Sequence, residues 1–245
     1  MRLVLACAFL LHYALGASVG FSVDEAHYAL YATHMALSYF DHPPLVGWVQ
    51  WPLVALEAPV AVLRWWPQLL WLGTALLVFQ IAERLQTPSR DTAFGAGFWG
   101  VLVLALAPLL HVLGIGLLPD TLLMFLTALL MWQTLGLMHP DALSRKWAWV
   151  ALGLVLGLAG LSKYTAIFAA LAVAWVLLAT HGLRLLRSPW PWVAVAVAVC
   201  AVSPVAIWNA QHGWISLVYQ TQHGKGGQWR VVPVGQFLVV QLVAY

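Results

Sequence analysis

Long apolar segments with almost no charge are the feature that most limits what this chain can fold into. Of its 245 residues, 63% are hydrophobic and only 8% are charged, whereas a soluble domain carries roughly 25% charged residues. So few charges cannot cover a soluble surface, and lipid must therefore cover much of it. The 15 tryptophans fit a protein with two membrane–water interfaces, where indole rings prefer to lie. The chain is predicted to be an integral membrane protein.

Several of these segments approach the roughly 20 apolar residues that a membrane-spanning helix needs. They cover residues 3–19, 65–82, two spans within 93–137, two within 147–180, 190–208, and the region from 232 onward. Residues 3–19 are not expected to be a signal peptide, because no convincing cleavage site follows them. The last segment is still apolar at Tyr245. We expect an all-α, polytopic helical bundle over residues 1–245, forming a single domain that is incomplete at the C-terminus.

The distribution of basic residues predicts an orientation for this bundle. If the N-terminus is cytoplasmic, most of the 11 Lys and Arg residues fall on the inner side, as the positive-inside rule requires. Residues 20–64 and 209–230 then form the two long outer loops, where function tends to reside. Acids do not set topology, so a site on the outer face is one explanation for the outer Asp24, Asp41 and Asp120. The net charge of +3 comes from scattered residues and does not favour nucleic-acid binding.

The first outer loop contains a segment, residues 24–40, that no Gly or Pro interrupts, and a helix is predicted there. At 3.6 residues per turn, one face carries polar side chains: Asp24, His27, Tyr31, His34 and Ser38. Such an amphipathic helix suits the membrane interface. The face can be merely solvated, with Asp24 favoured by the helix dipole. A metal site is less favoured on spacing, because His27 and His34 lie about 10 Å apart along a helix.

Two further positions have both a structural and a functional interpretation. Asp41 can cap the helix that follows Pro43 and Pro44, but capping explains neither His42 nor a second acid so near Asp24. Lys163 interrupts two apolar stretches, where an ammonium group is costly unless it faces a cavity or a partner. Its alternative role is to snorkel to the interface.

An ordered set of motifs resembles bacterial members of glycosyltransferase family 39, which are related to protein O-mannosyltransferases and to the aminoarabinose transferase of lipid A. The motifs are Asp-Glu-Ala-x-Tyr at 24–28, Tyr-Phe-Asp-His-Pro-Pro-Leu at 39–45, Pro-Asp at 119–120, Leu-Ser-Lys-Tyr at 161–164, and Ile-Trp-Asn-x-x-His-Gly-Trp at 207–214. The first motif alone is weak, but the ordered set covers nearly the whole chain. Family members are usually longer, so we expect this chain to be a fragment or a short form.

The resemblance implies an all-helical fold of the GT-C type and transfer of a hexose-type sugar from a polyprenyl-phosphate donor. It places the reaction on the periplasmic face of a bacterial inner membrane, with inversion at the anomeric carbon. The acceptor is a hydroxyl of a protein, a lipid or a glycan. Asp24 is then the catalytic base and Asp120 a second catalytic acid near it. Membrane lipids surround the protein, and no nucleic acid is involved.

The same resemblance suggests which side chains contact the substrates. Lys163 and His42 are expected to bind the donor phosphate. Asp41 matches a position that holds a divalent ion in some relatives, although metal dependence varies within the family. Helix capping remains the alternative for Asp41 and Asp120. The full set of expected substrate-binding residues is Glu25, His27, Tyr28, His42, Lys163, Tyr164, His212 and Trp214.

Three alternatives stay open at this stage. The loop 209–230 can be an interfacial segment anchored by Trp214 and Trp229, with Gln220 and His223 near the substrate only if it is not. The whole chain can be a transporter or channel, since intramembrane charges and broken helices occur there too. It can also be a non-catalytic, truncated relative of the family.

Overall fold

The computed structural model describes residues 1–86, 94–223 and 231–244, and all secondary structure in these parts is helical. The predicted all-α class is therefore confirmed. In chain order the elements are α1 (Arg2–Ser18), α2 (Val23–Thr33), α3 (Leu45–Ala55), α4 (Val60–Leu63), α5 (Trp65–Leu85), α6 (Ala96–Leu106), α7 (Pro108–Ile115), α8 (Pro119–Leu137), the 3₁₀ helix η1 (Pro140–Ser144), α9 (Lys146–Ser162), α10 (Ala166–His181), α11 (Arg184–Arg187), α12 (Pro189–Gln211), α13 (Ile215–His223) and α14 (Val231–Ala244).

Three helical stretches in the described part are long and apolar enough to cross a membrane: Val60–Leu85, α8 and α12. Two bent pairs add to them, α1 with α2 at 81° and α6 with α7 at 78°, which gives up to five spans if each pair counts as one. The second bend lies at Pro108, whose ring and missing N–H interrupt a helix. Residues 147–180, predicted to hold two spans, form the shorter apolar helices α9 and α10.

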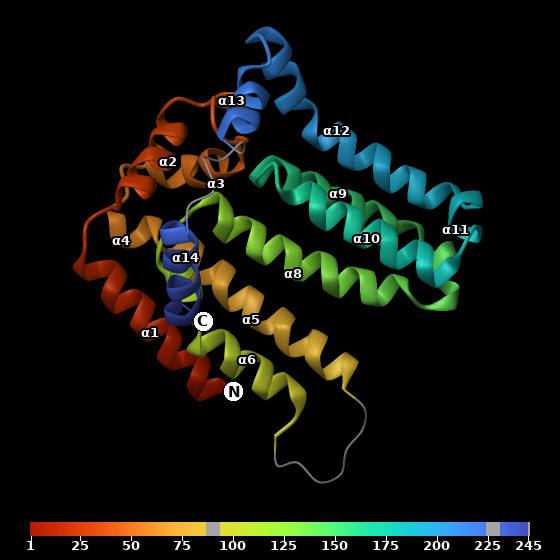
Figure 1. Ribbon diagram of the computed structural model, residues 1–245, viewed down its shortest axis with the longest axis horizontal. Helices are drawn as coiled ribbons and strands as arrows, with labels where there is room; N and C mark the ends of the chain where they lie inside the picture. The colour runs from red at the N-terminus through yellow and green to blue at the C-terminus, as the bar shows by residue number, and fades with distance from the viewer. Residues whose placement is uncertain (87–93, 224–230, 245) are drawn as a thin grey trace.

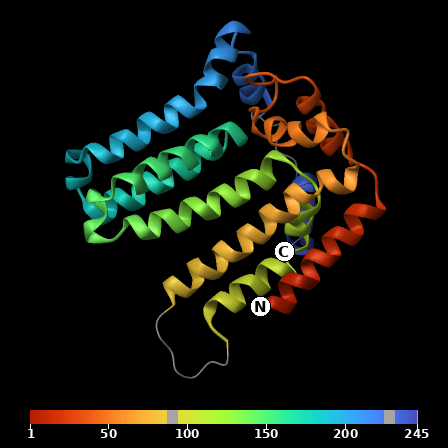
Figure 2. The same ribbon diagram turned by 180° about the vertical axis from the view of Figure 1, so that it is seen from behind.

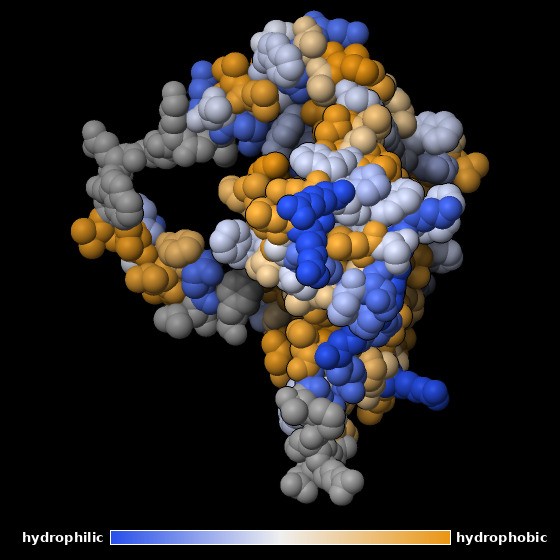
Figure 3. All heavy atoms as spheres, turned by 90° about the vertical axis from the view of Figure 1, so that its right-hand side faces the viewer, coloured by the Kyte–Doolittle hydropathy of each residue, from blue (hydrophilic) through white to orange (hydrophobic). Residues whose placement is uncertain are grey.

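The long helices α5, α8, α9, α10 and α12 run beside one another, with α2, α3 and α13 at one end and α11 at the other (Figures 1 and 2). Figure 3 looks onto the end that carries α11, where hydrophilic groups lie across the face and hydrophobic groups flank them. Four exposed basic residues belong to this end: Arg145, Lys146, Arg184 and Arg187. These basic residues therefore lie at the opposite end of the bundle from α2, which carries Asp24.

Close packing of α9 against α12 depends on small residues. A Cβ added at Gly153 would lie 2.3 Å from the carbonyl oxygen of Ala194, and one at Gly157 would lie 2.4 Å from the Cβ of Ala201. Two glycines four residues apart let the two backbones approach, as small residues do between helices in membranes. The buried Trp149 and Leu152 of α9 extend this contact into the main core.

The predicted helix over residues 24–40 is too long. The observed helix α2 ends at Thr33, and the chain then folds back on itself. The hydroxyl of Tyr39 contacts the carbonyls of Tyr31 and His34, and the Trp48 indole donates to the carbonyl of Ala36. These tertiary contacts satisfy backbone groups outside a helix, so they override a local preference that no Gly or Pro opposes. Ser38, predicted on the polar face, is fully buried instead.

Candidate active site

The buried guanidinium of Arg64 holds the corner between α1 and α2. It donates to the carbonyls of Gly16, Val19 and Gly20 at 2.6–2.8 Å. These are carbonyls at the C-terminal end of α1, which lack partners within the helix and favour a cation. Arg64 also forms two hydrogen bonds of 2.8 Å to the carboxylate of Glu25 on α2. One side chain thus fixes how α2 leaves α1.

Glu25 is occupied at the start of α2. Its backbone N–H donates to the Ser22 hydroxyl at 3.2 Å, and its carboxylate accepts from the Ser22 N–H at 2.9 Å, which completes a capping box. Burial alone would raise the pKa of Glu25, but the hydrogen bonds from Arg64 and Ser22 outweigh burial and lower the pKa. Glu25 was predicted to bind substrate, but in the structure its carboxylate binds Ser22 and Arg64. Its neighbour Asp24 is exposed in the first turn of α2.

The carboxylate of Asp41 is the centre of a polar cluster. Tyr31 donates its hydroxyl to Oδ1, while His27 Nε2 and His42 Nδ1 lie 3.1 and 3.2 Å from Oδ2. Burial alone would raise the pKa of Asp41, but hydrogen bonds from His42 and Tyr31 hold the pKa well below its usual range. Asp41 is therefore ionised at neutral pH and orients both imidazoles. The ring of Tyr39 stacks on that of Tyr31 at 3.6 Å and supports the cluster from behind.

Helix α13 brings a distant part of the chain against this cluster (Figure 1). Ser216 donates its hydroxyl to the carbonyl of Tyr39 at 2.9 Å, and Gln220 donates its amide to the carbonyl of Asp41 at 2.6 Å. The rings of Phe40 and Tyr219 pack at 4.5 Å. The two loops predicted from the sequence, 20–64 and 209–230, are therefore in contact through residues 39–41 and 216–220.

A second carboxylate pairs with the lysine that the sequence singled out. Lys163 Nζ lies 2.6 and 2.8 Å from the two oxygens of Asp120. The preceding Ser162 donates to the carbonyl of Pro119 at 2.7 Å, so the end of α9 is attached twice to the start of α8. Lys163 is 27% and Asp120 49% exposed, which leaves both accessible to a ligand.

The hydroxyl of Tyr28 lies 3.5 Å from His42 Nδ1 and is affected by the charges of three carboxylates. Burial raises the pKa of the Tyr28 hydroxyl, and the charges of Asp41, Asp24 and Asp120 raise it further. Asp24 comes from α2, Asp41 from the following loop and Asp120 from the first turn of α8. The acids therefore share one side of the molecule with Lys163 and His42.

Helix capping explains neither Asp41 nor Asp120. Helix α3 begins at Leu45 after Pro44, and α8 begins at Pro119 after Leu118, so neither acid occupies an N-cap position. The first-turn position of Asp120 still matches the helix dipole, but its oxygens bind Lys163. The capping alternative that the sequence left open is wrong for both residues.

The surroundings of Asp41 give no support to the expected divalent ion. Its oxygens are committed to Tyr31, His27 and His42, and no group of three His, Cys, Asp or Glu side chains within the described residues is arranged to hold a metal. The divalent ion expected at Asp41 stays a prediction.

The remaining predicted residues lie farther along the chain. His212 stacks on Trp208 at 4.0 Å and contacts the Trp208 carbonyl, while Trp214 is exposed in the turn between α12 and α13 with a φ of 58°. The hydroxyl of Tyr164 is buried, without a hydrogen-bond partner among the described residues. Residues 224–230, including Trp229, and the side chain of His223 lie outside what the structure describes.

Sequence reasoning missed the residues that hold the site together. Arg64 was not predicted as a site residue, although a lone arginine just before an apolar segment is a signal for a buried partner. Gln220 was expected near the substrate, whereas it binds the backbone of Asp41. No sequence pattern links residue 220 to residue 41, because the contact depends on the path of α12.

Comparison with known proteins identifies the family. Residues 41–208 match the family described as dolichyl-phosphate-mannose-protein mannosyltransferase. The chain belongs to this family. The resemblance to glycosyltransferase family 39 is thereby confirmed, and the all-helical architecture agrees with a membrane fold of the GT-C type. The match begins at Asp41, so Asp24 precedes the matched segment.

One curated relative is the lipid A galacturonosyltransferase RgtD of Rhizobium johnstonii, which is 28% identical over 196 residues. The alignment covers 78% of this chain and 39% of the relative, so the chain spans well under half of that protein's length. No solved structure matches the chain.

Proposed function

We propose that the protein transfers a hexose-type sugar from a polyprenyl-phosphate donor to an acceptor hydroxyl on the outer face of a bacterial inner membrane. The observation that carries this proposal is the set of polar groups at one end of the bundle: Asp41 contacts His27 and His42, Lys163 pairs with Asp120, and Asp24 is exposed in the first turn of α2. The family name supports a lipid-phosphate donor, and the relative's name supports a saccharide acceptor on a lipid. A hydroxyl of a protein or of a glycan could accept the sugar by the same chemistry.

The three carboxylates have different environments, and these suggest different roles. Asp41 is ionised and occupied by three donors, which makes it a poor proton acceptor. Asp120 shares both oxygens with Lys163. Asp24 is exposed in the first turn of α2, where an acceptor can approach it. Asp24 is therefore the residue that we assign as general base.

The proposed reaction is a single displacement. Asp24 takes the proton of the acceptor hydroxyl while that oxygen attacks the anomeric carbon of the sugar. The bond between this carbon and the phosphate oxygen breaks, and polyprenyl phosphate leaves with the electron pair. One displacement inverts the anomeric configuration. A single carboxylate suffices because phosphate leaves without protonation, whereas glycosidases also protonate the leaving oxygen and therefore need two.

Lys163 and His42, on the same side, are assigned to the phosphate, where they stabilise the charge that develops on it. Lys163 is accessible and lies beside Asp120, and His42 is oriented by Asp41. His27 and Tyr28 border the same space on α2 and are assigned to sugar binding, where aromatic faces and imidazole nitrogens contact hydroxyl-rich rings. Asp120 positions the ammonium of Lys163 between turnovers.

Replacing the base tests this proposal. Membranes that contain Asp24→Asn should transfer labelled sugar from a polyprenyl-phosphate donor about 10²–10⁴-fold more slowly than wild type, the usual contribution of a general base. Folding should be unchanged, because Asp24 is exposed. Glu57→Gln is the matched control, since Glu57 is another exposed acid of the predicted outer loop, and it should keep wild-type activity.

The result also separates the competing functions. If the protein is a transporter, wild-type membranes would move a solute but label no acceptor. If it is a non-catalytic relative, neither wild type nor any variant would label an acceptor. Near-normal turnover by Asp24→Asn would show that another group is the base.

A further inference from the structure

The turn between α12 and α13 is built around Asn209, a buried residue that the proposed reaction does not use. Its backbone carbonyl accepts the N–H of Trp214 at 2.8 Å, and its side-chain oxygen accepts the N–H of Ser216 at 3.3 Å. Gly213 and Trp214 both have a positive φ, 63° and 58°, a conformation that favours glycine and reverses the chain after a helix. The motif Ile-Trp-Asn-x-x-His-Gly-Trp at 207–214 therefore forms a reversal that turns α13 back toward the first loop.

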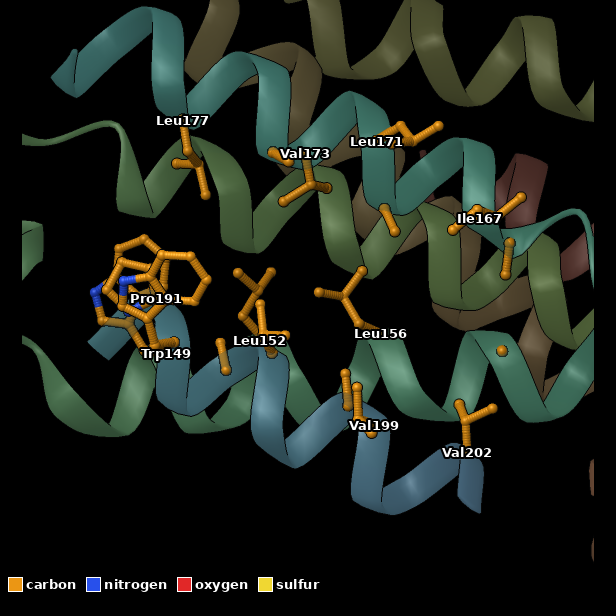
Figure 4. Close-up of a pocket in the computed structure, with 18 of the residues that line it drawn as sticks. Trp149, Leu152, Leu156, Ile167, Leu171, Val173, Leu177, Pro191, Val199 and Val202 are labelled. Atoms are coloured by element: carbon orange, nitrogen blue, oxygen red, sulfur yellow. The ribbon is translucent and has the colours of Figure 1, made fainter. Parts of the chain in front are cut away.

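Helix α12 fixes where this turn lies. It packs along α9, and a Cβ added at Gly160 would lie 2.7 Å from the side chain of Val202. Figure 4 shows Val199 and Val202 of α12 and Leu156 of α9 lining one apolar cavity. Asn209 follows Val202 by about two turns of the same helix. The position of the turn is thus set by a helix that is closely packed against its neighbour.

One face of α13 contacts the first loop. Ser216 and Gln220 lie one turn apart, so they share a face, and they donate to the carbonyls of residues 39 and 41 at 2.9 and 2.6 Å. Between these two contacts, Tyr219 packs on the ring of Phe40. Ser216 is fully buried, so water is excluded from its contact. Three consecutive residues of the first loop are thus held by a helix that lies far away in the sequence.

The contact matters because residues 39–41 belong to no helix. Helix α2 ends at Thr33 and α3 begins at Leu45, so the segment between them depends on tertiary contacts for its position. The start of this segment is held from within the first loop, where the Tyr39 hydroxyl and the Trp48 indole bind the carbonyls of residues 34 and 36. The end of the segment is held by α13.

That end carries groups assigned to the reaction. The Asp41 carboxylate lies 3.1 Å from His27 Nε2 and 3.2 Å from His42 Nδ1, so a shift of the Asp41 backbone would misplace His42 and lose the contact with His27. We propose that Ser216 and Gln220 are positioning residues, which hold Asp41 and through it keep His42 at the donor phosphate. The inference rests on the proposed function, and it gives α13 a role in phosphate binding without contact to the substrate.

Two substitutions remove these donors with little change in size. Ser216→Ala leaves the carbonyl of residue 39 without its donor, and Gln220→Met does the same at residue 41. Gln220 is only half-buried, so Gln220→Met should fold even if Ser216→Ala does not. Thr221→Val is the matched control, because the exposed Thr221 hydroxyl donates at 2.9 Å to a carbonyl within α13 itself.

Equilibrium binding to the full chain in detergent micelles tests the proposal, with labelled 55-carbon polyprenyl phosphate and the uncharged polyprenol as probes. The Kd for polyprenyl phosphate should rise about 3–10-fold in Ser216→Ala and in Gln220→Met, the affinity equivalent of one lost hydrogen bond. Polyprenol binding should be unchanged in both variants, because the contact acts on the phosphate, and unchanged binding also reports that the fold is retained. Thr221→Val should match wild type for both probes.

A double variant tests whether the effect passes through His42. Adding Gln220→Met to His42→Ala should cause no further loss of polyprenyl phosphate binding, because the imidazole that Gln220 positions is already gone.

Three outcomes would overturn the inference. Unchanged binding of polyprenyl phosphate in both single variants would show that the loop keeps its place without α13. An equal loss for polyprenol would show a general structural effect, and additive losses with His42→Ala would show a route that bypasses the imidazole. Failure of the transferase proposal is distinguishable, because the phosphate-specific pattern of binding would then persist while wild-type membranes transferred no sugar.

Discussion

At the scale of single residues, environment rather than residue type separates three similar carboxylates. Asp41 is held by a tyrosine and two histidines, Asp120 is paired with a lysine, and Asp24 is exposed on a helix turn. A carboxylate that accepts several hydrogen bonds loses basicity, whereas an accessible one can take a proton. The structure thus shows different partners and exposure for three acids that the sequence could only place near one another.

Asp120→Asn tests the positioning role of that residue. Losing one charge-assisted contact should lower transfer, expressed as kcat/KM for the donor, by about 10–100-fold. The change should appear mainly as a higher KM for the donor, because Lys163 loses the partner that holds it. Steady-state kinetics with varied donor, beside Lys163→Arg as the charge-conserving comparison, measure this. A loss as complete as that of Asp24→Asn with unchanged KM would instead place Asp120 in the chemical step.

Asp41 makes the stability of the outer loop depend on pH. Because the pKa of Asp41 is lowered in the folded protein, its stabilising effect is complete above the unfolded value of about 4 and is lost as pH falls below it. The gap in melting temperature between wild type and Asp41→Asn should therefore be larger at pH 5 than at pH 3 and should shrink as the pH falls below 4. Thermal unfolding in detergent measures the gap. A gap that stays constant below pH 4 would contradict the assignment.

At the scale of elements, the corner between α1 and α2 sets where Asp24 lies. Arg64, from the junction of α4 and α5, binds the end of α1 and the start of α2 at once. The motif containing Asp24 was recognisable in the sequence, but the 81° bend was not. The bend depends on a partner 39 residues away from Glu25, and local preference carries no information about such a contact.

Removing one partner of this buried pair should be strongly destabilising. Arg64→Ala leaves the Glu25 carboxylate buried without its counter-ion, which typically costs about 3–5 kcal/mol. The double variant Arg64→Ala with Glu25→Gln should recover part of that loss, because the uncompensated charge is gone. Arg187→Ala, at an exposed arginine in α11, should shift the free energy of unfolding by about 0.5 kcal/mol or less. Additive losses in the double variant would mean that the two residues act independently.

At the scale of the whole molecule, exposed basic residues and the carboxylates of the candidate site lie at opposite ends of the helical bundle. The exposed Arg145, Lys146, Arg184 and Arg187 lie at the end with α11, and the carboxylate cluster lies at the end with α2 and α13 (Figure 1). This separation supports an orientation with the site outside under the positive-inside rule. The sequence-based assignment of loops to two sides thus agrees with the arrangement of the helices.

Thiol labelling in intact cells tests the orientation. In a chain whose Cys7 and Cys200 are replaced by Ala, Thr33→Cys at the end of α2 should react with a membrane-impermeant maleimide. Ser144→Cys in η1 should react only after the inner membrane is permeabilised. Both parent residues are exposed hydroxyl-bearing side chains, so access rather than reactivity decides the result. The reverse pattern would place the candidate site in the cytoplasm.

The sequence by itself determined the membrane class, the helical architecture, most helix positions and the family. These properties depend on composition, apolar runs and ordered motifs, which are local or additive along the chain. Only the tertiary structure decided that residues 24–40 break after Thr33, that Asp41 and Asp120 are not helix caps, and that α13 closes over the first loop. Each of these depends on hydrogen bonds between distant segments, and a pairing of that kind exists only once the chain has folded.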